Sequence, residues 1–311
     1  IGGIIAVSYV ESQFEFNLIS PSVLDYSVID GTEPAESMLT VNEYIAEDYW
    51  FAVNGSSLPE NLQGVRSRAD EISEKYGVRI LLSSQCLPAC TFAEYPTTTT
   101  DQMDLADEAA SINAALDSLE EALSLYPEGF FPQFRSEFGD GGIRIMLVGG
   151  FESNFNMIGY SVQNSLWHNI YVDIFSEGLV GTYCHEIWHA TEDHITSINY
   201  GEFDVVQWAE LNPDGFQYIF DPAESILNEG DYTYFGSTKP KDCYFIDGYA
   251  KTNEREDRAR IMEYAMTGFF GSELSEYPHL YAKLRYMSDK IRQYFDTTGW
   301  STPRWEDALG E

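Results

Sequence analysis

One short segment of the sequence has the residue types and spacing to bind a metal ion and use it, C-H-E-I-W-H over residues 184–189. Residues four apart on an α-helix are offset by only about 40°, so His185 and His189 would present two imidazoles on one face. Glu186 would lie beside them, where its carboxylate can reach a metal-bound water. This H-E-x-x-H pattern is typical of zinc hydrolases. The alternative is an ordinary helix that contains two histidines.

A catalytic zinc site needs a third protein ligand and an open position for water. His194 follows His185 by nine residues, whereas the metzincin pattern requires a spacing of ten and a glycine where this chain has Glu192. We therefore expect His194 to be a surface residue near the helix end. The other candidates are the carboxylates that begin a later helix: Glu254, Glu256 and Asp257.

Spacing alone does not choose among these carboxylates. Asn253 or Thr252 is suited to cap that helix, and Asn253 followed three residues later by Glu256 forms a capping-box pattern. Such a capping role would explain Glu256 without any metal. From the residues themselves, the identity of the third ligand stays open.

The segment Y-A-K-T-N-E-R-E over residues 249–256, with Ala259 after it, resembles a stretch of the gluzincin branch represented by the anthrax lethal factor catalytic domain. That stretch is a Tyr, two residues, Thr-Asn-Glu, one residue and a ligand Glu. The resemblance implies that Glu256 is the third zinc ligand. It also implies that Tyr249 faces the reacting carbonyl and donates a hydrogen bond in the transition state.

The chain is also similar to secreted or lipid-anchored zinc metallopeptidases of gut bacteria, on W-A-E-L-N-P-D-G-F at 208–216 and E-D-R-A at 256–259. The similarity extends from about Leu62 to about Phe270. It implies a bacterial protein that is extracellular or held at the cell surface, with any lipid anchor on a segment outside this chain. The absence of an initial Met agrees with a processed or trimmed form.

Two features depart from the lethal factor pattern. Arg260 stands where that family has an acidic residue one turn after the ligand Glu, and the segment between the two metal-binding helices is longer here. A carboxylate should still fix the tautomer of each histidine ligand. The candidates for this role are Asp257, Asp193 and Glu192.

Together these features predict a zinc-dependent endopeptidase of the gluzincin type, with a peptide or protein as substrate. In this hypothesis His185, His189 and Glu256 bind Zn²⁺, and Glu186 takes a proton from water and passes it to the leaving amine. Tyr249 stabilises the oxyanion. The alternative is a zincin-like cell-surface binding module that has a metal site but little or no proteolytic turnover. A third possibility is a structural helix pair with buried histidines.

Composition excludes other classes of function. The chain has 311 residues and a net charge of −34, from 51 acidic and 17 basic residues. Nucleic acid binding needs a basic surface, so a nucleic acid partner is excluded. No apolar run approaches the roughly 18 residues of a membrane span.

Cys86 and Cys90 are close enough in sequence for a disulfide in an oxidising compartment. The alternative is that all four cysteines are free, mostly buried thiols.

The elements that must position the site follow from periodicity. Residues 1–57 alternate apolar runs and turns, which indicates an N-terminal β-rich segment of unknown role; its first seven residues lack the basic flank of a signal peptide. Residues 58–311 are expected to form the catalytic domain. The predicted helices cover residues 62–76 (ended by Gly77), 101–123, the segment around 185, 253–266 and 280–295, and the predicted strands cover 78–82, 143–148 and 169–175.

These elements predict an α+β, zincin-like fold. Its mixed sheet would accompany an active-site helix that carries H-E-x-x-H and a following helix that carries the third ligand. We expect the strand at 169–175 to form the sheet edge that pairs with an extended substrate. Trp167 and His168 would then line the cleft.

Overall fold

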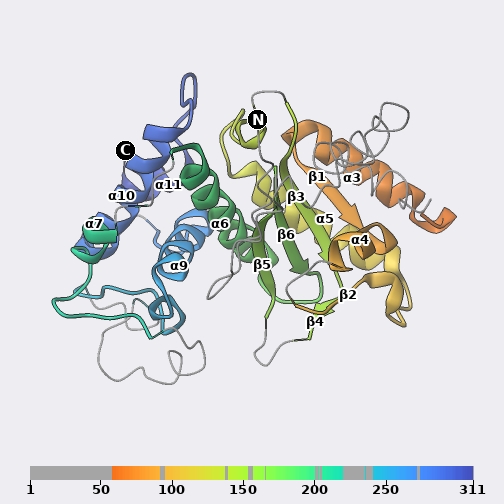
Figure 1. Ribbon diagram of the computed structural model, residues 1–311, viewed down its shortest axis with the longest axis horizontal. Coiled ribbons are helices and arrows are strands. Elements are labelled where there is room, and N and C mark those ends of the chain that lie inside the picture. Colours follow the sequence, from red (N-terminus) through yellow and green to blue (C-terminus); the bar gives the residue numbers. More distant parts are fainter. Residues whose placement is uncertain are drawn as a thin grey trace, which may run out of the picture. The chain divides into compact units, whose positions relative to one another are not determined.

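The computed structural model (Figure 1) describes residues 58–91, 95–136, 139–152, 157–164, 166–199, 203, 205–219, 235, 241–271 and 274–310. Its contacts divide the chain into two compact units. Among the described residues, the first unit takes in 58–114, 131–152 and 160–175, and the second takes in 115–130, 157–159 and 176–310. The predictions for residues 1–57 lie outside the described residues and stay predictions.

The first unit is built on a four-stranded sheet with the strand order β1-β3-β6-β5. The strands are β1 (Arg79–Leu82), β3 (Gly142–Val148), β5 (Gly159–Asn164) and β6 (Trp167–Asp173). Strands β1, β3 and β6 run parallel, with Ile80 opposite Ile145 and Ile145 opposite Ile170. The three predicted strands are therefore confirmed, within two residues at each end.

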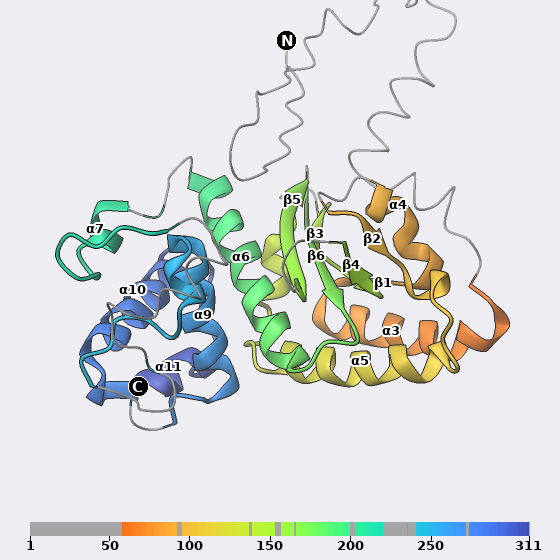
Figure 2. The same ribbon diagram turned by 90° about the horizontal axis from the view of Figure 1, so that it is seen from below.

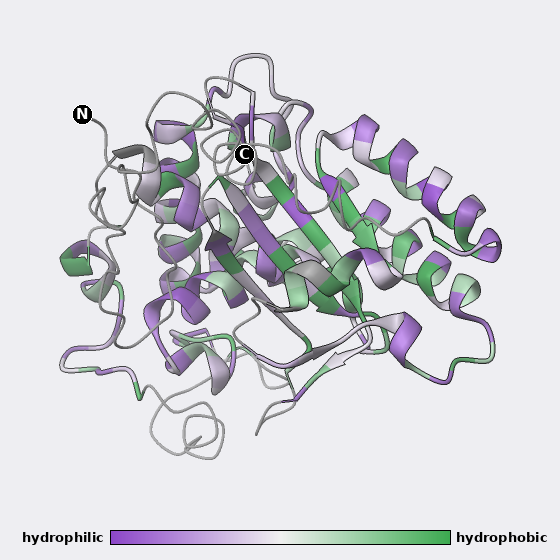
Figure 3. Cartoon of the chain, turned by 45° about the vertical axis from the view of Figure 1, so that its right-hand side comes forward, coloured by the Kyte–Doolittle hydropathy of each residue, from purple (hydrophilic) through white to green (hydrophobic). Residues whose placement is uncertain are grey.

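The parallel strands form around apolar runs, I-L-L in β1, I-M-L-V in β3 and I-Y-V in β6. All seven residues of β3, G-I-R-I-M-L-V, are buried, which is the pattern expected of a strand covered on both faces. Green stretches follow the central strands in Figure 3. Helix α3 (Gln63–Tyr76) contacts β1 and buries Val65, Ala69 and Ile72. It ends at Gly77, whose φ of 77° is the left-handed conformation that glycine adopts easily, as predicted.

The expectation that the strand at 169–175 forms the sheet edge is wrong. Strand β6 lies between β3 and β5, so β5 holds the edge position. The run I-Y-V within β6 is fully or almost fully buried, and such an uninterrupted apolar run is typical of an interior strand. His168 is also buried, with its ring edge-on to Phe134 at a centroid distance of 5.5 Å. It does not line a cleft.

The four cysteines are free thiols, so the expected Cys86–Cys90 disulfide is wrong. Cys86 lies in a 3₁₀ turn (Ser83–Cys86) and Cys90 in the following short helix α4 (Leu87–Thr91). Residues four apart on a helical backbone have Cβ atoms about 5–6 Å apart, beyond the roughly 3.5–4.5 Å of a disulfide. Cys86 packs in the core beside Leu81 and Met146.

The second unit is helical, and its largest interface joins α6 (Leu179–Asn199) to α9 (Glu254–Thr267). Helix α9 also contacts α10 (Pro278–Tyr294) and α11 (Arg304–Leu309); Figure 2 shows these helices together. A 3₁₀ turn, η7 (Tyr249–Lys251), leads into α9, and the short α7 (Val205–Ala209) follows α6. In the part of the chain that the structure describes, no helix combines the length and the apolar character of a membrane span. Predicted helices around 185, 253–266 and 280–295 are confirmed.

Helix α5 (Glu108–Ser124) begins seven residues later than the predicted start at Asp101. Thr99 and Gln102 form a capping box around a separate 3₁₀ turn (Thr100–Gln102). The side chain of Asp107 then accepts a hydrogen bond from the amide of Ala110 at 3.0 Å. Thr99 and Gln102 therefore stabilise the 3₁₀ turn, and Asp107 stabilises the start of α5. The elements that the sequence did not predict are β5, α4, α7, α11 and the two-residue pair β2 (Thr97–Thr98) and β4 (Gly150–Phe151).

A buried ion pair lies where α9 meets α10. Lys283 Nζ is 2.6 Å from Asp257 Oδ2, and both side chains are completely buried. Lys283 also donates to the carbonyl of Tyr244 at 2.9 Å and lies 4.3 Å from the ring centroid of Phe245. The hydroxyl of Tyr218 donates to the same Asp257 oxygen at 2.9 Å. Each charge therefore has several partners inside the interface.

Candidate metal centre

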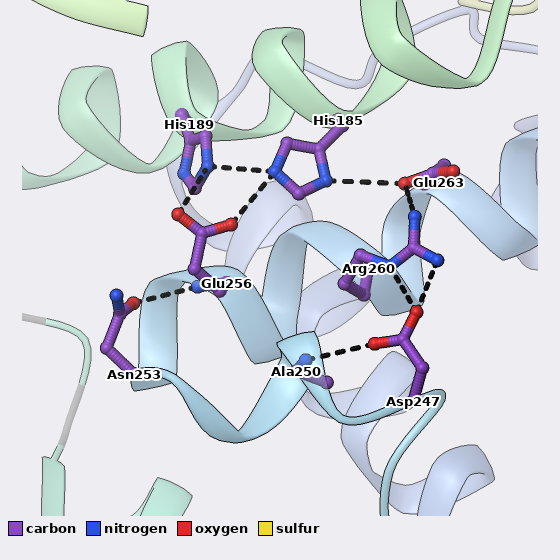
Figure 4. Close-up of polar contacts among 8 residues, drawn as sticks. All are labelled: His185, His189, Asp247, Ala250, Asn253, Glu256, Arg260 and Glu263. Carbon is purple, nitrogen blue, oxygen red and sulfur yellow. Dashed lines mark hydrogen bonds and ion pairs between the residues drawn. The ribbon is translucent and has the colours of Figure 1, made fainter. Parts of the chain in front are cut away.

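Helices α6 and α9 bring His185, His189 and Glu256 together (Figure 4). His185 Nε2 lies 3.2 Å from His189 Nε2 and 3.0 Å from Glu256 Oε2. His189 Nε2 lies 3.5 Å from Glu256 Oε1. Each residue offers one ligand atom, and these atoms lie within 4.8 Å of one another, so the cluster could hold a metal ion.

The spacing of these donors fits a four-coordinate metal. With donor distances of about 2.0–2.2 Å and tetrahedral angles, two ligand atoms are about 3.3–3.6 Å apart. The observed separations of 3.0, 3.2 and 3.5 Å are close to this value. Protons alone satisfy the cluster poorly, because two imidazole nitrogens that face each other can share only one hydrogen. The residues present therefore fit a metal ion, in number and in type.

The electrostatics of the cluster favour a cation. Burial by itself lowers the pKa of His185, but hydrogen bonds to Glu256 and Glu263 outweigh it and raise that pKa to about 10. Burial would raise the pKa of Glu256, yet the neighbouring His189 and His185 hold it well below the usual range. A metal ion would replace the proton that His185 otherwise carries, so metal binding and proton release are linked.

Helix α9 supplies the carboxylate partner of His185. Glu263 Oε2 lies 3.3 Å from His185 Nδ1, the ring nitrogen that points away from the cluster. Such a contact fixes the tautomer and the ring orientation of a histidine ligand. Glu263 follows Glu256 by seven residues, about two turns, and so lies on the same face of α9. That spacing was available in the sequence and was missed.

The three acids expected to play this role have other partners. Asp193 pairs with Arg255 at 2.7 Å, Glu192 with Arg258, and Asp257 with Lys283. The first two pairs join α9 to α6, and the third joins α9 to α10. The expectation that Asp193, Glu192 or Asp257 orients a histidine ligand is therefore wrong. Each of these acids forms an ion pair with a basic residue that is distant from it in sequence.

Glu186 is buried beside the cluster. Glu186 is 4% exposed, and its Oε2 has no hydrogen-bond partner among the described residues. Burial raises the pKa of Glu186 above its ordinary value, against the opposing charges of His185 and His189. Gly159 leaves the room for this carboxylate, because a Cβ there would lie 3.0 Å from Glu186 Oε1. The unpartnered oxygen is suited to accept a proton.

Tyr249, on the turn η7, lies beside the same cluster, with its ring centroid 6.3 Å from that of His185. Burial, followed by the negative charges of Glu256 and Glu186, raises the pKa of Tyr249 well above its ordinary value. The phenol therefore stays neutral and keeps its proton for donation. The structure brings all five residues proposed for the site together in the second unit.

His194 is not a surface residue, which corrects the expectation. It is 7% exposed, and its ring packs 5.4 Å from the ring of Phe295. Nine residues after His185, it has turned through about 900°, or half a turn net, and so lies on the opposite side of α6. The conclusion that His194 does not join the metal cluster agrees with this position.

The start of α9 shows why Glu256 can serve as a ligand. Asn253 is the N-cap residue, with its side chain accepting a hydrogen bond from the Glu256 amide at 2.9 Å. The Glu256 backbone thus completes the cap, while its carboxylate faces the two imidazoles. The second contact of a capping box, from the Glu256 carboxylate to the Asn253 amide, is replaced by contacts of that carboxylate with His185 and His189.

Comparison of the chain with models of protein families, with curated proteins and with solved structures gives no match.

Proposed function

We propose that the protein is a zinc-dependent endopeptidase, in which His185, His189 and Glu256 bind the metal. The observation that carries this proposal is the spacing of their three ligand atoms at 3.0–3.5 Å, with the carboxylate of Glu186 buried next to them. Zinc finger-like structural sites have four protein ligands. Three ligands and an adjacent base are the composition of a catalytic site.

When bound, zinc would polarise the scissile carbonyl and lower the pKa of water. Glu186 accepts the proton from the attacking water, and its raised pKa makes it able to deliver that proton to the leaving amine. Tyr249 donates a hydrogen bond to the oxyanion. Loss of a single donor of this kind typically costs a factor of about 10²–10³ in kcat. Glu263 orients His185 through Nδ1.

The substrate class is a peptide or protein, and the resemblance to secreted metallopeptidases supports a place outside the cell or at its surface. The net charge of −34 disfavours nucleic acid as a substrate. A zincin-like fold and gluzincin membership are part of the same proposal, supported by the order of the two metal-binding helices along the chain.

The test combines zinc content with peptide cleavage. The purified protein should contain one zinc per chain, and it should cleave a mixed peptide library at sites that Glu186→Gln does not cleave. Glu256→Ala should lose zinc, whereas His194→Ala, on the opposite side of the same helix, should retain it. Zinc without cleavage would favour the binding-module alternative. Absence of zinc, or loss of zinc from His194→Ala alone, would overturn the proposed ligands.

A further inference from the structure

A row of charged side chains continues from the metal cluster along α9 to the turn that carries Tyr249 (Figure 4). Glu263 Oε2, which contacts His185 Nδ1, is also paired with Arg260 Nη1. On its other side, Arg260 Nε donates to Asp247 Oδ2 at 3.0 Å. Arg260 therefore bridges two carboxylates with one guanidinium.

The second of these carboxylates holds the turn η7. Asp247 Oδ1 accepts a hydrogen bond from the amide of Ala250 at 3.0 Å, and Ala250 follows Tyr249 directly. The side chains of Arg260 and Glu263 are only 20% and 15% exposed. Partial burial weakens solvent screening, and a planar guanidinium can hold two carboxylates in fixed directions. A continuous set of polar contacts thus joins His185 to the backbone beside Tyr249.

Charge alone would give Arg260 the opposite effect. A positive charge near a cation site repels the cation, so Arg260 as a mere charge would weaken metal binding and its removal would strengthen it. Arg260 as a structural link would do the reverse, because its removal releases Glu263 from the position that orients His185. The two roles therefore predict opposite changes in zinc affinity when Arg260 is replaced.

We propose that Arg260 is a positioning residue that holds Glu263 against His185 and Asp247 against the Tyr249 turn. Through these contacts, the metal ligand His185 and the oxyanion donor Tyr249 keep fixed positions relative to each other. The part of the inference that concerns Tyr249 in catalysis rests on the proposed function. The part that concerns the metal ligand does not need turnover.

The first test measures zinc affinity by competition with a chelator. Arg260→Ala and Arg260→Lys should both weaken zinc binding, by about tenfold, the lower end of the effect of changing an outer partner of a ligand. Lysine keeps the charge but cannot bridge both carboxylates. The control is Arg255→Ala, which removes another α9–α6 ion pair, with Asp193 at 2.7 Å, and should change the affinity by less than about twofold. Far-UV circular dichroism and thermal unfolding of the zinc-free variants establish that each is folded.

Tighter or unchanged zinc binding in Arg260→Ala would overturn the inference, as would full zinc affinity in Arg260→Lys. The variant Asp247→Asn tests whether the contacts of Arg260 with Asp247 also support the metal ligand. This change should weaken zinc binding in the wild-type background but add nothing when Arg260 is already alanine, because coupled sites are not additive. Equal losses in both backgrounds would show that Asp247 acts independently of Arg260.

The second test concerns Tyr249 and uses cleavage kinetics. Tyr249→Phe and Arg260→Ala should each lower kcat at zinc saturation with little change in KM, and the double variant should lose less than the product of the two single losses. A full product would overturn the link to Tyr249. If the wild type cleaves nothing, the proposed function fails, while the zinc measurements still decide whether Arg260 positions the ligand.

Discussion

The buried pair of Lys283 and Asp257 gives a sharp prediction about stability. Lys283→Met keeps the length and much of the volume of the side chain but removes its charge. Asp257 then keeps only the hydroxyl of Tyr218 as a donor from the contacts described above, in a site where it is completely buried. Removing one partner of a buried ion pair typically costs about 3–5 kcal/mol. For a chain of 311 residues, with an unfolding entropy of about 2.1 cal/mol/K per residue, that corresponds to a fall of about 5–8 °C in Tm.

The pH dependence of this loss has a defined sign. Burial raises the pKa of Asp257, and the attraction of Lys283 opposes that rise. Without Lys283 the folded-state pKa rises further above the unfolded value, so stability is lost as pH increases through the folded pKa. The deficit of Lys283→Met relative to the wild type should therefore be larger at pH 8 than at pH 5.

The assay is urea and thermal unfolding followed by circular dichroism, with Lys290→Met as the control on the same helix. Lys290 is half-buried over the ring of Tyr286, and its replacement should change the free energy of unfolding by about 1 kcal/mol or less. The double variant Lys283→Met/Asp257→Asn should recover a large part of the loss, because no charge is left unpaired. A cost below about 1 kcal/mol for Lys283→Met, or a double variant less stable than the single one, would refute the reasoning.

Three further predictions concern the metal, the base and acid stability. Zinc at 100 times its dissociation constant should raise the free energy of unfolding by about 2.7 kcal/mol, and a calorimetric scan with His185→Ala should show no such gain. Gly159→Ala should lower kcat without loss of zinc, since its Cβ would displace Glu186; equal kcat would contradict this. Burial raises the pKa of Glu306, but hydrogen bonds from Arg292 and Ser288 outweigh it and leave the pKa lowered. Its contribution is present above the unfolded value of about 4.3 and lost as pH falls through the folded pKa, so Glu306→Gln and wild type should converge in stability in acid.

Local patterns in the sequence were sufficient for the elements whose apolar residues repeat regularly. The helices that carry His185 and Glu256 were predicted from spacing and from the Asn253 cap, and the structure confirms both elements. The strands at 78–82 and 143–148 were predicted from their apolar runs, and the strand at 169–175 from its alternating pattern. Strand β5 was missed because its sequence, G-Y-S-V-Q-N, is largely polar, and its place at the sheet edge requires no continuous apolar run.

Relations between distant segments were not accessible in the same way. Which acid contacts His185 depends on which basic residues neutralise the others, and the Arg255–Asp193 pair spans 62 residues of sequence. The burial of His194 depends on Phe295, about a hundred residues later. The sequence indicates which side chains could bind a metal; the competition among their charges is decided only by the tertiary packing.

The three ligand atoms come from two helices that are far apart in sequence and meet at one interface. Neither helix alone offers all three ligands, so the proposed zinc ion would bind with full strength only while α6 and α9 are docked. Opening of this interface should then become rarer as zinc is added. Amide hydrogens of α9 that exchange through such opening should slow in proportion to zinc occupancy, whereas amides that exchange through fraying at the ends of α3 should not. The metal would in this way set the local dynamics of the second unit, in addition to its chemistry.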